Sequence, residues 1–186
     1  MAGFENGLIV GRFQTFHTGH QEIIEKALAV CEKVLQFVGS SQESMTAKNP
    51  FSYELRETML KSCFPEAVAE GRLIIAPLPD AGLGNVPAWG RYVLDQAKER
   101  FDMVPELLVS GKEPRRVSWF DNEGVVMHEL YLDKEIEISA TMMREFFLSD
   151  DEENWRKYSP KALWPMYDRL RDVVIASQEN TETASM

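Results

Sequence analysis

Short apolar segments alternate with helix-patterned segments along this chain of 186 residues, and this alternation constrains its fold more than any other feature. Short apolar runs suit strands that are buried on both faces of a sheet, and amphipathic segments between them suit the helices that connect parallel strands. The apolar runs are Leu8–Val10, Val34–Val38, Leu73–Ala76, Leu107–Ser110 and Val125–Leu130. We therefore predict an α/β fold, with a Rossmann-like open parallel sheet and helices on both of its faces.

Helical periodicity and capping residues predict the helices. The expected helices run from His20 to Cys31, from a capping Ser52 to about Cys63, from Trp89 to Phe101, from Thr141 to Leu148, and from a capping Ser159 and Pro160 to about Ala176. The segment Pro77–Pro87 is rich in proline and glycine, which predicts a loop. We expect residues 1–176 to form one domain and the polar residues 177–186 to form a disordered tail.

Composition narrows the classes of partner and location. The net charge of −10 argues against nucleic-acid binding, because an acidic surface repels phosphate backbones. No apolar run is long enough to cross a bilayer, and residues 1–10 lack a secretory signal, so we expect no membrane partner and a cytoplasmic location. Cys31 and Cys63 lie in helix-patterned segments without metal-ligand spacing, so we predict that both are core thiols.

The segment Gly11–His20, GRFQTFHTGH, stands where the first predicted strand meets the first predicted helix. Ligands of open α/β sheets bind beyond the carboxyl ends of the strands, and a helix start offers unpaired N–H groups to phosphate. His17 and His20 can both point at one phosphate group, and Arg12 adds a permanent cation. We therefore predict a phosphate site in this segment.

Two glycines support that interpretation. Gly11 removes a side chain where the backbone passes close to a ligand, and Gly19 permits a tight entry into the helix. His17 and His20 could instead be surface residues beside a turn. Two of the chain's three histidines lie here together with an arginine and both glycines, and this combination favours a functional site.

A second motif, ISATMMR, occupies Ile138–Arg144. Ser139 or Thr141 can cap the helix that follows, and the N-terminus of that helix makes a second anion site. Arg144, one turn on, can reach the same phosphates. Taken alone, this segment could also be a plain capped helix.

The two motifs resemble those of the HxGH nucleotidyltransferases, GRFQPFHxGH and ISxTxxR. The match places Phe13 and Gly19 on motif positions, whereas Thr15 replaces the motif's proline. The resemblance implies the nucleotidyltransferase fold. It also implies that these segments contact the phosphates of ATP.

Within this superfamily the chain most resembles the archaeal-type nicotinamide mononucleotide adenylyltransferases. Gly39–Gln42 (GSSQ) and Thr46–Phe51 (TAKNPF) are similar to two of that family's segments. Arg56 matches the arginine of its ER pair, although Leu55 replaces the glutamate. The family's basic residue before NPF contacts phosphate, which implies that role for Lys48, whereas a solvated surface lysine is the alternative.

The segment Pro77–Trp89, PLPDAGLGNVPAW, resembles the family's PxPDxxxNxxW segment, which holds the nicotinamide ring and its carboxamide. The resemblance places Asp80, Asn85 and Trp89 in a nicotinamide site. Asn85 can offer a donor and an acceptor to an amide, and Trp89 a flat face to a cationic ring, although Trp89 could also be a core residue. The spacing from Asp80 is longer than in the archaeal form, and Lys112 stands where relatives often carry asparagine.

The resemblance implies a reaction in which the 5′-phosphate of nicotinamide mononucleotide, or of nicotinate mononucleotide, attacks the α-phosphorus of ATP. Pyrophosphate leaves, and NAD or deamido-NAD results. His17, His20 and Arg144 would be catalytic, with His20 at the α-phosphate, while Arg12 and Lys48 neutralise charge. Mg²⁺ would bridge ATP oxygens, with protein ligands that the sequence does not identify, and the enzyme would be a homo-oligomer.

Two alternatives remain open at the level of sequence. The chain could be an HxGH nucleotidyltransferase with another acceptor, such as pantetheine phosphate, flavin mononucleotide or a CTP-dependent alcohol phosphate. It could also be a non-catalytic nucleotide sensor on the same fold. The Asn85 and Trp89 loop argues against the first alternative, and retention of His17, His20 and Arg144 argues against the second.

Overall fold

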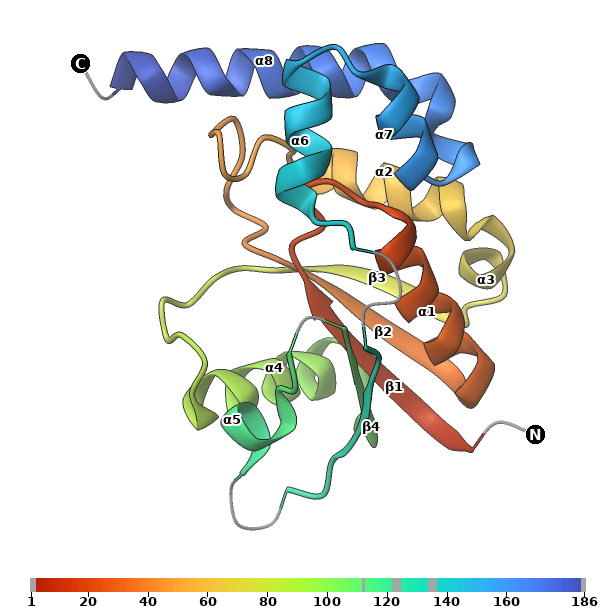
Figure 1. Cartoon of the computed structure of the whole chain (residues 1–186). Helices are drawn as coiled ribbons and strands as arrows, with labels where there is room; N and C mark the ends of the chain where they lie inside the picture. The colour runs from red at the N-terminus through yellow and green to blue at the C-terminus, as the bar shows by residue number, and fades with distance from the viewer. Residues whose placement is uncertain (1–2, 112, 122–124, 134–136, 185–186) are drawn as a thin grey trace.

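A five-stranded parallel sheet forms the centre of the molecule (Figure 1). The computed structural model describes residues 3–111, 113–121, 125–133 and 137–184. The strands are β1 (Phe4–Gly11), β2 (Cys31–Gly39), β3 (Leu73–Leu78), β4 (Leu107–Ser110) and β5 (His128–Tyr131). Their order is β3-β2-β1-β4-β5, so the chain builds the sheet in one direction from β1 and then crosses back to add β4. The predicted parallel α/β sheet is confirmed.

Residues that alternate along the strands belong to two separate cores, one on each face of the sheet. Ile9, Val34 and Val38 lie in the larger core, whereas Leu8 and Leu35 lie in the smaller one. Successive side chains of a strand point to opposite faces, so each of these continuous apolar runs supplies both cores at once. This is the reason that helices must cover both faces.

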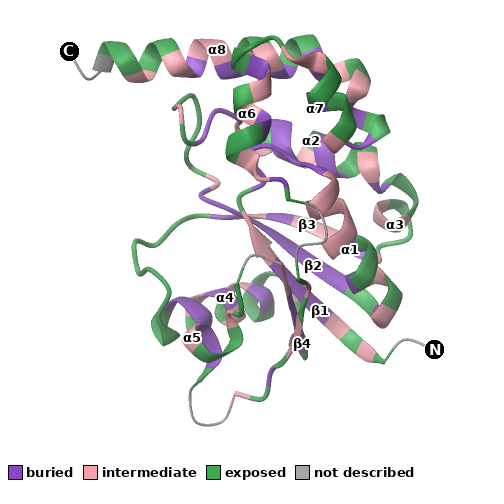
Figure 2. Cartoon of the chain, viewed as in Figure 1, coloured by how far each residue is buried: buried purple, intermediate pink, exposed green. Residues whose placement is uncertain are grey.

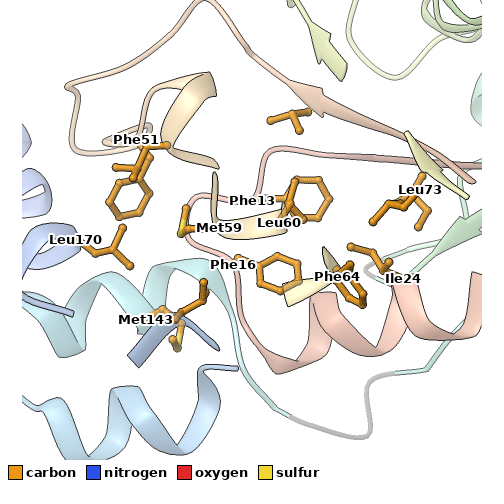
Figure 3. Close-up of a cluster of buried hydrophobic side chains, with 14 of the residues drawn as sticks. Phe13, Phe16, Ile24, Phe51, Met59, Leu60, Phe64, Leu73, Met143 and Leu170 are labelled. Atoms are coloured by element: carbon orange, nitrogen blue, oxygen red, sulfur yellow. The ribbon is translucent and has the colours of Figure 1, made fainter. Parts of the chain in front are cut away.

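The larger core is covered by α1 (Thr18–Val30), α2 (Tyr53–Cys63), α3 (Pro65–Ala69) and the helices after residue 139. Figure 3 shows part of this core, where Phe13 and Phe16 of the first motif lie near Ile24, Met59 and Met143. The first motif is therefore anchored by its aromatic residues in the main core.

The smaller core is covered by α4 (Pro87–Phe101) and α5 (Arg116–Phe120) (Figure 2). Gly90 of α4 lies directly against the backbone of α5, because a Cβ at Gly90 would stand 1.8 Å from the carbonyl oxygen of Trp119. Only glycine permits this approach. The close contact fixes Trp119 beside Trp89.

Several predicted boundaries were wrong, and β5, for example, begins at His128 rather than at Val125. Cys31 is the first residue of β2 rather than part of the preceding helix, because α1 ends at Val30 and Cys31 pairs with Phe4 of β1. Pro77 belongs to β3 rather than to the following loop, since β3 is an edge strand and can tolerate a residue without an N–H. Both cysteines are free, and burial raises the pKa of Cys31 to about 11 and that of Cys63 to about 12.

The C-terminal part of the chain also differs from the prediction. After α6 (Ala140–Leu148), the structure has α7 (Glu152–Tyr158), a 3₁₀ helix (Lys161–Met166) and then α8 (Tyr167–Ala184). Pro165 lies inside the 3₁₀ helix, and a proline cannot continue the hydrogen bonding of a regular α-helix. The last helix therefore begins later than expected.

Residues 177–184 form the end of α8 rather than a disordered tail. Ser177 is buried, and the hydroxyl oxygen of Thr181 accepts a hydrogen bond of 2.8 Å from the backbone N–H of Ala47. These contacts with the loop before α2 explain why a polar segment is ordered here. Sequence composition alone does not reveal such a partner.

Candidate active site

A cleft of about 500 Å³ opens at the carboxyl ends of the strands, where β1 lies between β2 and β4. This is the point at which the strand order reverses, the usual ligand site of an open parallel sheet. The cleft is lined by all thirteen predicted site residues: Gly11, Arg12, Phe13, His17, Gly19, Lys48, Asp80, Asn85, Trp89, Ser139, Thr141, Arg144 and His20. The structure therefore brings together four segments that are far apart in the sequence.

His17 and His20 stack on each other at the start of α1, with ring centroids 3.7 Å apart and planes inclined by 24°. The carbonyl of His17 accepts the backbone N–H groups of His20 and Gln21, at 2.9 and 3.1 Å. Gly19 makes room for the stack, since a Cβ there would lie 3.2 Å from Cε1 of His17. Both imidazoles are thus fixed beside the positive end of the helix.

Phe13 supports this histidine pair from the core side. Its backbone has a φ of 54°. Its buried ring meets the ring of His20 edge-on, with the two ring centroids 4.8 Å apart. The same ring covers Gly11, where a Cβ would stand only 2.8 Å from Cζ of Phe13. Gly11 is therefore required by the packing of the motif itself, in addition to any ligand.

A pair of buried hydrogen bonds joins the first motif to the segment Asn49–Phe51 (NPF). The side chain of Gln14 donates to the carbonyl of Phe51 at 2.9 Å and accepts from the N–H of Phe51 at 2.8 Å. Arg12 donates to Oδ1 of Asn49 at 3.4 Å. Lys48 is exposed and lines the cleft next to these contacts, so its ammonium group is available to an anionic ligand.

Arg56 lies buried behind the cleft, and the sequence analysis gave it no physical role. Its fully buried guanidinium donates to the carbonyls of Arg12 (2.9 Å), Gly39 (2.8 Å) and Ser40 (3.2 Å), and its Nε donates to the carbonyl of Ser52 at 3.2 Å. Burial lowers the pKa of Arg56 to about 10, which leaves it charged at neutral pH. It joins the ends of β1 and β2 to α2.

A signal for this role was present in the sequence. Arg56 follows Leu55 and precedes Met59 and Leu60, which lie on the apolar side of α2. An arginine beside such a face must find several acceptors when it is buried. The pattern could have indicated a buried arginine, although not the carbonyls that it binds.

The second motif approaches the cleft from α6. Ser139, rather than Thr141, caps this helix: its Oγ accepts the N–H of Met142 at 3.2 Å. Arg144 donates to the carbonyl of Gln14 and to Oγ1 of Thr141. Burial, followed by the positive charge of Arg12, lowers the pKa of Arg144. Arg12 and Arg144 line the same cleft.

The opposite end of the cleft is formed by the loop before α4 and by α5. Asp80 stabilises a turn in this loop, because its Oδ1 accepts a hydrogen bond of 2.9 Å from the N–H of Gly82. Asn85 Oδ1 accepts a hydrogen bond of 3.2 Å from Nε1 of Trp119. Trp89 is buried and contacts Trp119 edge-on at 6.4 Å, so it belongs to the core and lines the cleft as well.

Three further residues line this end and were missed by sequence analysis. Trp119 lies under the guanidinium of Arg115, which is 5.6 Å from the ring centroid and forms an ion pair with Glu113. They follow β4 in a segment without a recognisable motif. Lys112, which departs from the family pattern, lies outside the described residues.

Within the described part of the chain, no group of three or more His, Cys, Asp or Glu side chains is placed to hold a metal ion. The end of the cleft near His17 and Arg144 instead presents imidazole, guanidinium and ammonium groups. Such donors suit phosphate oxygens rather than a hard cation.

The cytidylyltransferase-like family matches residues 8–76, which include the first motif. The nicotinamide-nucleotide adenylyltransferase of Pyrococcus abyssi is 39% identical, over 90% of this chain and 84% of the relative. The chain belongs to the nicotinamide-nucleotide adenylyltransferase family. The corresponding protein of Saccharolobus solfataricus is 29% identical, over 90% of this chain and 96% of the relative.

A solved structure supports the fold of this adenylyltransferase family member. A bifunctional NMN adenylyltransferase/ADP ribose pyrophosphatase from Francisella tularensis, complexed with AMP and a manganese ion, aligns with a TM-score of 0.71 at 22% sequence identity. The alignment covers 96% of this chain and 53% of the other, so this chain spans about half the length of the bifunctional protein.

Two of the departures from the family's motifs, Thr15 and Leu55, lie in the core behind the cleft. Thr15, in place of proline, is buried, and its hydroxyl contacts the sulfur of Met59 at 3.9 Å. Leu55, in place of glutamate, is buried in the same core. Neither substitution removes a polar group from the cleft of this adenylyltransferase family member.

No helix of the described residues is long and apolar enough to span a membrane.

Proposed function

We propose that this chain transfers the adenylyl group of ATP to nicotinamide mononucleotide or nicotinate mononucleotide, which forms NAD or deamido-NAD and releases pyrophosphate. The observation that carries the proposal is the single cleft that joins a cationic phosphate end to an aromatic end. Membership of the nicotinamide-nucleotide adenylyltransferase family supports the same reaction.

The reaction is a direct displacement at the α-phosphorus of ATP. The 5′-phosphate of the mononucleotide is already anionic at neutral pH, so no strong general base is needed. Catalysis then depends on alignment of the two substrates and on stabilisation of the charge that develops on the phosphate oxygens. A cleft that holds both substrates at the edge of one rigid sheet provides the alignment.

The stacked imidazoles of His17 and His20 are proposed to donate hydrogen bonds to the ATP phosphates, with His20 at the α-phosphate. Their support by Phe13 and by the start of α1 means that they need not reorganise during the reaction. Arg144, which is held against the carbonyl of Gln14, and the exposed Lys48 would neutralise the remaining phosphate charge.

At the other end, Asn85 and Trp89 are proposed to receive the pyridine ring and its substituent. Asp80 would shape this loop through its contact with Gly82 rather than bind the substrate directly. This assignment places the 5′-phosphate of the acceptor between the aromatic end and the histidines, which the reaction requires.

Mg²⁺ is proposed as the cofactor, and it would lower the charge on the ATP oxygens. The cationic donor set of the phosphate end suits an ion that is held by the nucleotide and by water, as magnesium prefers. The Francisella tularensis neighbour is complexed with a manganese ion, and a divalent metal in a related protein agrees with this proposal. We further propose that the enzyme acts in the cytoplasm as a homo-oligomer.

The proposed reaction is tested by pyrophosphate release from ATP and Mg²⁺ with a panel of acceptors. We expect release with a pyridine mononucleotide and background release with pantetheine phosphate, with flavin mononucleotide, and with an alcohol phosphate plus CTP. Turnover of one of the latter, without turnover of either pyridine mononucleotide, would contradict the proposal. Measurable ATP binding with no release from any acceptor would indicate a nucleotide sensor instead.

A further inference from the structure

Trp119 determines which end of the Asn85 side chain can face a substrate. The indole N–H can only donate a hydrogen bond, so its partner at 3.2 Å must be the oxygen of the Asn85 amide rather than the nitrogen. This assigns the orientation of an amide that would otherwise be ambiguous. Asn85 lines the cleft, and because its oxygen is turned toward Trp119, its NH₂ group is turned away from the indole.

The structure holds Trp119 firmly in this position. Its indole is buried and packs against Trp89 and Phe120, both edge-on. Its carbonyl lies directly against Gly90, where there is no room for a Cβ, and its backbone N–H donates to the carbonyl of Arg115 at 2.9 Å. The exposed Asn85 is thus oriented by a residue that cannot easily move.

The orientation matters because the two possible acceptors differ only in the group attached to the pyridine ring. A carboxamide has one oxygen that accepts hydrogen bonds and one NH₂ group that donates them, whereas a carboxylate only accepts. An NH₂ group from Asn85 can pair with an oxygen of either. An oxygen from Asn85 could pair only with the carboxamide.

We propose that Trp119 is a positioning residue of the acceptor subsite: it fixes Asn85 as a hydrogen-bond donor, so that the enzyme binds the acceptor through an oxygen and uses nicotinate mononucleotide as well as nicotinamide mononucleotide. This inference rests on the proposed function. Arg115 lies over the Trp119 ring and adds a positive charge at the same end, which its ion pair with Glu113 moderates.

The first test is Trp119→Phe, which keeps an aromatic ring and removes the N–H. Asn85 is then free to turn over. Nicotinamide mononucleotide can pair with either end of the Asn85 amide, whereas nicotinate mononucleotide can pair only with its NH₂ group. We expect kcat/KM for nicotinate mononucleotide to fall about tenfold and that for nicotinamide mononucleotide only a few-fold, on the scale of one hydrogen bond. An equal fall for both acceptors would indicate a merely structural role and overturn the proposal.

Trp164→Phe is the matched control for this substitution. Trp164 also donates its indole N–H, to the carbonyl of Ser159 at 3.4 Å, but it lies in the C-terminal part of the chain outside the cleft. We expect this variant to keep the wild-type ratio of kcat/KM for the two mononucleotides. A similar change of ratio in both variants would also overturn the proposal.

The second test, Asn85→Asp, does not depend on how well the Trp119 variant folds. One carboxylate oxygen can still accept the Trp119 N–H, while the other now faces the cleft as an acceptor. We expect nicotinate mononucleotide turnover to fall at least about a hundredfold through repulsion of like charges, with a far smaller loss for nicotinamide mononucleotide. Undiminished use of nicotinate mononucleotide would overturn the proposal.

The wild-type protein separates this inference from the proposed function. Turnover of neither mononucleotide would contradict the proposed function itself. Turnover of nicotinamide mononucleotide without any turnover of nicotinate mononucleotide would leave the function intact and overturn only the role of Trp119. Turnover of both, with the expected change of ratio in the variants, would support both.

Discussion

The two ends of the cleft are built in different ways. At the phosphate end, buried side chains bind backbone groups of distant segments, as Gln14 does with Phe51 and Arg56 with Gly39. At the acceptor end, residues 81–88 are all exposed, and Asn85 is held by one side-chain hydrogen bond. The proposed phosphate contacts therefore belong to the scaffold, whereas the proposed acceptor contacts lie on a loop that can change in length without disturbing the sheet.

The largest effect is expected from His20→Ala at the phosphate end. Loss of one donor to a developing phosphate charge should lower kcat by at least about a hundredfold, with little change in the unfolding temperature. Steady-state assays of pyrophosphate release would measure this. His128→Ala is the control, because His128 is an exposed residue of β5 that contacts Phe4, and its activity should stay near wild type. A loss of only a few-fold for His20→Ala would contradict its assigned role.

Arg56→Gln should lower the free energy of unfolding by about 2 kcal/mol, because carbonyls at the ends of β1 and β2 lose their buried donor. Urea denaturation would give this value. The exposed Arg169→Gln is the matched control and should change stability by no more than about 0.5 kcal/mol. Equal stability of the two variants would mean that the phosphate end is not tied to the fold as described.

Asn85→Ala should act on binding at the acceptor end alone. We expect KM for the mononucleotide to rise about tenfold, while KM for ATP and the unfolding temperature stay near wild type. Kinetics with each substrate varied in turn would show the separation. A comparable rise in KM for ATP would break the distinction between the two ends.

The smallest effect is expected at the start of α6. Ser139→Ala removes the cap and should cost about 1 kcal/mol of stability, while Thr141→Ala, which leaves the cap intact, should cost less. Thermal or urea unfolding of both variants would test this. A larger loss for Thr141→Ala would contradict the assignment of the cap.

Features that depend on local sequence were predicted, apart from several boundaries and the C-terminal helix. The apolar runs gave the strands, and the two motifs gave residues that now line one cleft. Features that depend on a distant partner were not predicted: the hydrogen bond from Trp119 to Asn85 joins α5 to the loop before α4, and Arg56 binds carbonyls that no pattern identifies. Cys31 shows a third limit, because an apolar residue fits the end of a helix as well as the start of a strand.

The C-terminal helix has a practical consequence for work with shortened or tagged forms. Its last turns look expendable by composition, yet Ser177 is buried and Thr181 holds Ala47, the neighbour of Lys48. A protein trimmed at residue 176 would keep every motif while losing the contact that supports the loop of Lys48. A fusion partner is better attached beyond α8, whose end extends past the sheet in Figure 1, than in place of it.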